Sequence, residues 1–429
     1  MNPCLGATLV HLYKSMQKEN VIWFRNDLRI SNNAAVNAAI ESGQKTQAIY
    51  FLENRTQKIG PYRKTFLIET LESLKTSLIN YSITLNIIEG NVFDEIERFL
   101  SQKKPMRVFT NKGYAHDEVE QELLFAAEKH IEMAFYDDGF LIAPHALPFE
   151  IKDLPNTFTE FRKKLEKIGL DQLVGEHVHN SHISISKNNT QTDTLNRHPK
   201  SVFPFRGGES AALERLHDYL WNTRNILRYK ETRNGLLGTE YSSKFSPWLA
   251  CGCISPQCIY TEIKKFEREV EANESTYWLV FELLWREYFR YVMLKYGNKL
   301  FLPGGIKEAR KETEPNNANQ LFDTWTNGQT GDDFVDANMR ELKHTGFMSN
   351  RGRQNAASYL VHQLKLDWRR GARYFEKMLI DYDVFSNWGN WAYLAGVGND
   401  PRENRVFNTQ KQAEMYDPDK AYRKSWLEG

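Results

Sequence analysis

The spacing of apolar residues changes along this chain, and that change limits the folds it can adopt. Through residues 20–140, short apolar runs alternate with segments whose apolar residues recur every three or four positions. Such alternation indicates strand–helix–strand units that pair into a parallel sheet. We expect strands at 21–24, 48–52, 85–88 and 107–110, and helices at 34–40, 65–78, 92–100 and 118–129.

Helical spacing dominates from residue 209 onward, where no segment resembles a strand. We expect helices there at 211–221, 256–270, 277–295, 334–344, 351–365 and 368–379. The intervening segment, 141–208, is rich in proline and polar residues and is typical of a connector, with one helix near 158–168.

The sequence thus predicts an α/β N-terminal domain with a Rossmann-like parallel sheet at 20–140 and an all-α domain at 209–429. Residues 1–19 are expected to form a leader, disordered or extended. No Gly-rich phosphate fingerprint occurs in the α/β part, so a nicotinamide oxidoreductase is disfavoured.

Charge and cysteine usage exclude several classes of protein. The formal net charge is +1, so any nucleic acid must bind in a local groove. No apolar run approaches the ~20 residues of a membrane span, and no basic stretch precedes the apolar patch of a secretory signal. We expect a cytoplasmic protein, with organelle targeting by residues 1–19 left open. The cysteines Cys4, Cys251, Cys253 and Cys258 lack zinc-site spacing, which predicts no metal and a reducing compartment.

Four segments of the helical part concentrate chemically active side chains. On a helix, Glu282 and Arg286 share one face, as do Trp285 and Phe289. A surface ion pair beside a core aromatic is an equally open interpretation. Residues 350–355 crowd polar and basic side chains at a helix start, which suits an anion or plain solvation.

The other two segments are equally ambiguous when taken singly. Residues 381–391 hold two carboxylates, two amides and two indoles, which fits acid/base or metal chemistry or a capped loop between helices. Residues 241–249 form a turn with hydroxyls and a lysine before a proline, which can donate hydrogen bonds to phosphate.

Taken together, these segments resemble the photolyase/cryptochrome family along nearly the whole chain. Residues 23–29, 282–290, 350–353 and 381–383 follow that family's order and spacing. Residues 202–209 and 346–355 look like the DASH cryptochrome branch in particular.

The resemblance implies FAD in the helical domain. Lys244 and the neighbouring serines would serve its phosphates, Arg353 would pair with Asp381 near the flavin, and Asn387 would lie by flavin N5. The implied FAD contacts are Tyr229, Ser242, Ser243, Lys244, Phe245, Ser246, Glu282, Arg286, Asn350, Arg353, Asp381, Tyr382, Asp383 and Asn387.

The implied activity is light-driven repair of cyclobutane pyrimidine dimers by an electron from reduced FAD. Glu282, Asn350 and Asn387 would be catalytic, and Arg286 would also hold DNA phosphates. Trp285, Gln354 and Tyr393 would face a flipped dimer. Because Gln354 and Tyr393 replace larger apolar residues of duplex-active photolyases, we expect a preference for single-stranded DNA.

Light-driven reduction of FAD in this family often uses three tryptophans. Trp391 and Trp368 match the inner two, whereas Pro315 stands at the outermost place. Trp325, Trp388 or a tyrosine is an open substitute.

An antenna, methenyltetrahydrofolate, is also implied. Its candidate contact is Glu118 in the loop 111–118, although a helix-terminal acid explains Glu118 equally well.

The alternative to repair is a monomeric blue-light receptor that binds FAD and nucleic acid without efficient repair. Glu282, Trp285 and Asn350 favour repair, because a pure receptor does not need them.

Overall fold

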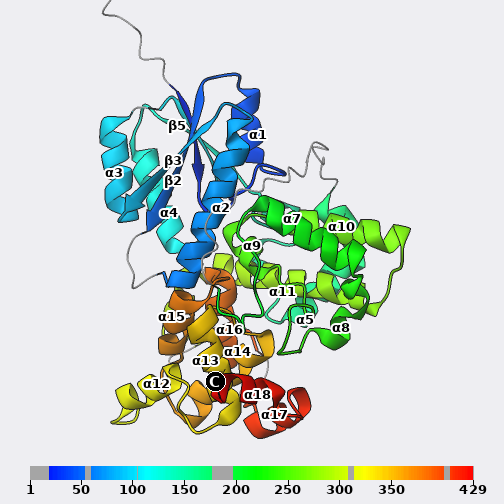
Figure 1. The fold of residues 1–429 in the computed structure, drawn as a ribbon. Coiled ribbons are helices and arrows are strands. Elements are labelled where there is room, and N and C mark those ends of the chain that lie inside the picture. Colours follow the sequence, from blue (N-terminus) through cyan, green and yellow to red (C-terminus); the bar gives the residue numbers. More distant parts are fainter. Residues whose placement is uncertain are drawn as a thin grey trace, which may run out of the picture.

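A computed structural model describes residues 19–53, 59–103, 105–175, 197–307, 314–400 and 406–428. Five parallel strands form one sheet in the order β3-β2-β1-β4-β5, and the helical part lies beside and below it (Figure 1). The strands are β1 (Asn20–Phe24), β2 (Thr46–Glu53), β3 (Thr84–Gly90), β4 (Arg107–Asn111) and β5 (Glu132–Tyr136).

The centre of the sheet is β1, whose five residues are all buried. Val21 and Trp23 pack against α3 (Val92–Gln102) and α4 (His116–Ala127) on one face. Residues of β1 on the opposite face pack with α1 (Ala34–Glu41) and α2 (Pro61–Ile79). Burial on both faces explains why β1 is a continuous apolar run in the sequence. The predicted parallel α/β sheet is confirmed by the parallel pairing of its strands.

Strand β5 is absent from the sequence-based expectation. It lies at the edge of the sheet beside β4, and none of its five residues is buried. A short edge strand of this kind has neither a continuous apolar run nor a clean alternation, so its sequence carries little strand signal.

The second domain is helical, as predicted. Its helices, with those of the preceding connector, are α5 (Phe158–Ile168), α6 (Leu170–Val174), α7 (Glu209–His217), α8 (Tyr229–Thr232), α9 (Ser246–Cys251), α10 (Pro256–Glu269), α11 (Glu274–Tyr296), α12 (Ala318–Thr326), α13 (Asp333–Thr345), α14 (Asn350–Ser358), α15 (Trp368–Met378), α16 (Val384–Leu394), α17 (Thr409–Tyr416) and α18 (Ala421–Leu427).

Three helical expectations need correction. The helices expected at 211–221 and 351–365 each end in a π-helical turn, at Asp218–Asn222 and Tyr359–Gln363. The segment 381–391 is mostly the helix α16 rather than a loop, and the Asp383 side chain caps it. The predicted leader falls almost wholly outside the described residues, as does the polar stretch 181–194 of the connector. No described helix is long and apolar enough to cross a membrane.

A buried charged pair on α11 joins the two domains. The guanidinium of Arg286 donates to the carboxylate of Glu287 at 2.7 Å and to the carbonyl of Gly139 at 3.2 Å. The second oxygen of Glu287 accepts the Leu141 backbone N–H at 2.7 Å. These partners compensate a carboxylate that has no exposure to solvent. The chain leaving the sheet is therefore fixed to α11.

The turn after β1 makes a second junction. Gly252 has a φ of +69°, and a Cβ there would lie 2.0 Å from the Asn26 carbonyl oxygen, so only glycine allows this approach. The carboxylate of Glu209 accepts the backbone N–H groups of Ile30 and Ser31 at 2.9 Å each. The N-terminal domain is thus held at two separate places.

We predict that Glu287→Ala lowers the free energy of unfolding by about 3–5 kcal/mol, because it leaves the guanidinium of Arg286, which is only 13% exposed, without its carboxylate partner. Urea unfolding measures this. Glu274→Ala on the same helix is the control, since Glu274 makes only an exposed ion pair with Lys230 and should cost less than about 1 kcal/mol. Equal losses in the two variants would contradict the structural role of the buried pair.

Candidate functional site

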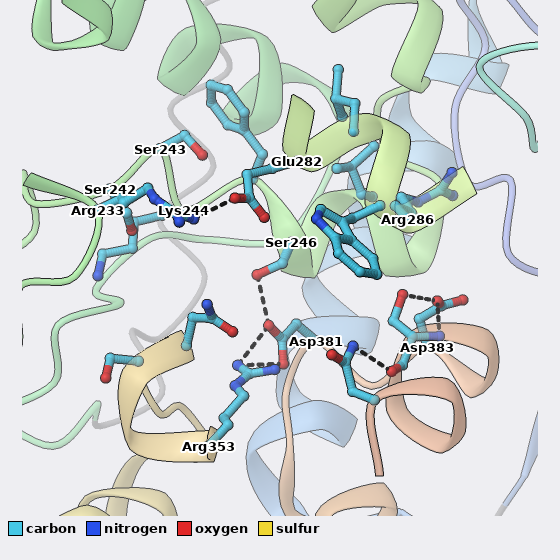
Figure 2. Close-up of a pocket in the computed structure, with 18 of the residues that line it drawn as sticks. Arg233, Ser242, Ser243, Lys244, Ser246, Glu282, Arg286, Arg353, Asp381 and Asp383 are labelled. Atoms are coloured by element: carbon cyan, nitrogen blue, oxygen red, sulfur yellow. Dashed lines mark hydrogen bonds and ion pairs between the residues drawn. The ribbon is translucent and has the colours of Figure 1, made fainter. Parts of the chain in front are cut away.

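A cavity of about 430 Å³ lies in the helical domain, lined by α8, α9, α11, α14 and α16 and by the turn before α9 (Figure 2). An adjoining space of about 100 Å³ shares part of this lining. Of the residues predicted for FAD and substrate, the main cavity brings together Tyr229, Ser242, Ser243, Lys244, Phe245, Ser246, Glu282, Trp285, Arg286, Asn350, Arg353, Gln354, Asp381, Asp383 and Tyr393. The adjoining space adds Tyr382, Asn387 and Trp391.

Lys244 is the most unusual group in the lining. It has a φ of +63°, and only 2% of the residue is exposed. Its ammonium lies 3.1 Å from the centre of the Tyr241 ring and has no hydrogen-bond partner among the described residues. Burial lowers its pKa well below the usual range. A buried ammonium without a partner is costly, so this place suits an anionic ligand.

An ion pair crosses the cavity wall below Lys244 in Figure 2. One nitrogen of Arg353 donates to both oxygens of Asp381, at 2.8 and 3.0 Å. The hydroxyl of Ser246 donates to the same carboxylate at 2.6 Å. The pairing that the family resemblance implied is therefore present, and it presents a fixed polar edge to the cavity.

Asp383 and Asn387 belong to the first turn of α16. The Asp383 carboxylate accepts the backbone N–H of Ser386 at 2.9 Å and lies 3.6 Å from Arg290. The Asn387 amide donates to the Ala372 carbonyl at 3.0 Å, which fixes its orientation.

These residues fit FAD. A dinucleotide needs cationic and hydroxyl groups for its phosphates, and Lys244 with the serines of its turn provides them. The ring system needs apolar walls with a few fixed polar groups, which Arg353, Asp381 and Asn387 provide.

Glu282 projects from α11 into the cavity and forms an ion pair with Arg233 (Figure 2). Burial raises the pKa of Glu282, and the nearby Arg233 opposes that rise. Burial thus favours the protonated form of Glu282, whereas the ion pair with Arg233 favours the ionised form.

Trp285 lies on the same face of α11. Its ring stacks on Phe158 with 3.8 Å between centroids and meets Tyr393 edge-on at 5.8 Å. Gln354 accepts a hydrogen bond from Arg351 at 2.9 Å. The three predicted substrate contacts therefore border one cavity, with one face of Trp285 already covered.

One predicted residue lies differently from expectation. Arg286 borders the cavity, but its guanidinium is engaged by Glu287 and Gly139 rather than turned to solvent. Trp368, predicted for electron transfer, lies outside the lining of both spaces. Glu118 lies in the first turn of α4, which agrees with the alternative of a helix-terminal acid.

Sequence reasoning missed several lining residues. Arg233 pairs with Glu282, which lies 49 positions further along the sequence, and no local sequence pattern predicts such a contact. Phe281 and Phe289 lie four positions to either side of Trp285, so the helical spacing around Trp285 contained their signal.

Behind the turn that carries Lys244 lies a buried acid. Glu341 of α13 accepts a hydrogen bond from the Tyr422 hydroxyl of α18 at 2.7 Å, and its other oxygen has no partner among the described residues. Burial raises the pKa of Glu341 to about 7, while Tyr422, Lys244 and Arg353 act against that rise.

The raised pKa of Glu341 predicts a pH dependence of stability. Between the ordinary value of 4.5 and about 7, the unfolded chain loses this proton while the folded protein keeps it. Stability present at low pH should therefore fall by about 3 kcal/mol as pH rises through this window. Urea unfolding at about pH 5 and about pH 8 measures the loss. The Glu341→Gln variant should lose less stability between these two pH values than the wild type, whereas Glu274→Gln should lose as much. An equal loss in Glu341→Gln would contradict the attribution of this pH dependence to Glu341.

The cysteines and acids form no evident metal site. Among the residues that the structure describes, no group of three or more His, Cys, Asp or Glu side chains is placed to hold a metal ion. Cys251 and Cys253 are buried free thiols. Burial raises the pKa of Cys251 to about 12, so the thiol stays protonated.

Comparison with known families covers both domains. Residues 20–178 match the family described as DNA photolyase, and residues 278–429 match the FAD binding domain of DNA photolyase. Cryptochrome DASH of Synechocystis is 42% identical over 426 residues, covering 95% of this chain and 87% of that protein. Cryptochrome DASH of Xenopus laevis is 42% identical over 431 residues, covering 94% and 81%.

Solved structures agree with these relatives. The crystal structure of the Synechocystis cryptochrome superposes with a TM-score of 0.86 at 41% identity, covering 96% of this chain and 89% of that one. A class III photolyase from Agrobacterium tumefaciens gives a TM-score of 0.78 at 26% identity, covering 97% and 88%. This chain therefore belongs to the photolyase/cryptochrome family, in its DASH cryptochrome branch, and carries that family's FAD-binding domain.

Proposed function

We propose that the protein repairs cyclobutane pyrimidine dimers in light, mainly in single-stranded DNA, and acts as a monomer. One observation carries the proposal. Glu282, an acid with a raised pKa, borders the same cavity as Lys244 and the Arg353–Asp381 pair. A proton donor for the substrate and the groups that fit FAD therefore share one space.

Bound FAD, reduced and excited by light, supplies the electron that opens the dimer's cyclobutane ring. The protein's own residues bind and orient. Lys244, Ser242 and Ser243 hold the phosphates, while Tyr229 and Phe245 pack beside them. Asp383, Tyr382 and Arg286 complete the cofactor contacts.

The amide of Asn387 is proposed to face flavin N5. Because its nitrogen is anchored on the Ala372 carbonyl, a neutral group is held there in a fixed orientation. A neutral amide is compatible with both oxidised and reduced flavin.

The substrate contacts follow from the cavity wall. In this proposal Glu282, in its protonated form, donates a hydrogen bond to a dimer carbonyl, where negative charge would develop. Asn350 lies at the start of α14, in the cavity lining, and can hydrogen-bond the edge of the same flipped dimer. Trp285 offers its uncovered side to the flipped dimer.

We expect Glu282→Ala to lower repair roughly tenfold to a hundredfold, because one hydrogen bond to a group that becomes charged is lost. The assay illuminates chemically reduced protein with a dimer-containing single-stranded oligonucleotide and scores dimer loss. Glu274→Ala, outside the cavity on the same helix, should keep wild-type repair. Wild-type protein that repairs no better than Glu282→Ala would instead favour a blue-light receptor that binds FAD and nucleic acid.

The preference for single strands is proposed from Gln354 and Tyr393. Gln354 is bound to Arg351, and Tyr393 meets Trp285 only edge-on, so neither adds a broad apolar face to a flipped dimer. The protein then gains less binding energy from the flipped dimer. Flipping a dimer out of a duplex costs a few kcal/mol, and this smaller gain offsets less of that cost.

The double variant Gln354→Met/Tyr393→Trp should strengthen binding to a dimer in duplex DNA by about 1–3 kcal/mol, the typical gain of one added stacking contact. Fluorescence anisotropy with duplex and single-stranded dimer substrates measures both affinities. If the double variant gained affinity for the single-stranded substrate alone, this explanation would be contradicted. The added apolar contact should help most with the duplex, where binding must also offset the cost of flipping the dimer out.

A methenyltetrahydrofolate antenna is proposed for the N-terminal domain, near Glu118. This residue lies beyond the carboxyl end of β4, beside β1, where the strand order reverses and ligands of such sheets bind. One Glu118 oxygen accepts the N–H groups of Tyr114 and Ala115 at 3.0 and 3.2 Å. The other accepts the Asn26 amide at 2.9 Å and, among the described residues, no second hydrogen bond, so we propose that it contacts the antenna.

A further inference from the structure

The route that brings electrons to the cofactor cannot follow the three positions that the family resemblance implies. The resemblance places the outermost one at Pro315, which has no aromatic ring. Pro315 lies just before α12, where its carbonyl accepts the Ala318 N–H at 3.0 Å. The inference rests on the proposed function only in taking FAD as the cofactor. For light to reduce that FAD, another oxidisable ring must deliver the electron from solvent.

The ring contacts of Trp391 lead toward α12. Trp391 lines the space beside the Arg353–Asp381 pair, and its ring meets Trp325 of α12 at 6.3 Å between centroids. Trp325 in turn meets Tyr374 of α15 at 5.7 Å. Trp325 is fully buried, and Tyr374 is partly exposed. Three oxidisable rings in successive contact thus connect the cavity to the surface.

The branch through Trp368 leads elsewhere. Trp368 contacts Trp388 at 5.7 Å, and Trp388 contacts Phe301 at 4.9 Å. Both indoles are 5% exposed. Phe301 is not oxidised by a tryptophan radical, and the other aromatic partner of Trp388 among the described residues is Tyr382, which itself lines the space beside the cavity. This branch therefore returns toward the cofactor site, whereas the contacts of Trp325 lead away from it.

Hydrogen bonding shows where a proton can leave. The indole N–H of Trp325 donates to the Ala356 carbonyl at 3.0 Å in a dry setting, so an oxidised Trp325 keeps its proton. The Tyr374 hydroxyl donates to the Thr326 carbonyl at 3.2 Å near the surface. A carbonyl is no base, but water can take the phenolic proton there.

We propose that Trp391, Trp325 and Tyr374 form the electron relay to FAD, with Tyr374 as the terminal donor. Bound oxidised FAD, excited by light, would be the acceptor of one electron. Trp391 donates that electron, Trp325 refills Trp391, and Tyr374 refills Trp325. Tyr374 releases its phenolic proton to water and becomes a neutral radical. An external thiol then returns an electron and a proton to Tyr374, while its sulfur is oxidised.

The test uses the FAD-loaded full chain with a thiol, illuminated in the absence of oxygen. Transient absorption and electron paramagnetic resonance identify the terminal radical and its lifetime. Wild-type protein should give a tyrosyl signal. Tyr374→Phe, which keeps the ring packing, should abolish that signal and shorten the charge-separated state. Trp325→Phe should do the same, and Trp368→Phe should leave both unchanged.

Two results would overturn the relay: a long-lived tryptophan radical in the wild type, or loss of the signal in Trp368→Phe with Tyr374→Phe unaffected. Unchanged FAD content in each variant excludes misfolding as the cause. Chemically reduced variants bypass the relay, so they should all repair dimers like the wild type. Absence of repair in every chemically reduced protein would refute the proposed function and leave the radical assignment standing.

Discussion

The buried contact between Arg286 and Glu287 is the interaction on which the arrangement of the molecule depends. It lies on α11 and ties down the backbone at Gly139 and Leu141, where the chain leaves the sheet. Other residues of the same helix, Glu282 and Trp285, border the cavity. One helix therefore sets both the position of the N-terminal domain and the geometry of the site. Any antenna in that domain is held at a fixed distance from the cofactor by this contact.

The site keeps polar groups in an arrangement that the protein alone does not satisfy. Lys244 has an unpartnered ammonium, and Tyr241 and Glu341 each have a buried oxygen without a partner among the described residues. Such groups are destabilising unless a ligand completes them. If the phosphates of FAD lie at Lys244 as proposed, cofactor binding should contribute to folding stability by pairing that ammonium, whereas Glu341 lies behind the cavity lining and stays buried.

The class of each domain could be predicted from the sequence because burial on two faces gives β1 its continuous apolar run and the helices their regular spacing. Strand β5 could not be predicted, since its residues are only partly covered at the sheet edge. Likewise, each of the four polar segments of the helical domain allowed two interpretations when it was taken singly. Only their order along the chain suggested a family and therefore a site. The Arg353–Asp381 pair could be predicted from that resemblance. The contact between Arg233 and Glu282 could not, because it joins two segments that are distant in the sequence and no local pattern predicts it.

The contact between Glu341 and Tyr422 bears on how the protein is made. The wall of the cavity begins with Tyr229, and the acid behind Lys244 is covered by a helix that starts at Ala421. Residues separated by most of the second domain must meet before the site is closed. During synthesis, the N-terminal sheet can fold while the ribosome is still adding helices, but the cavity lining is complete only once Leu394 has been made, and the cover over Glu341 forms only when α18 has emerged. Flavin capture should therefore be a late event in the making of the chain.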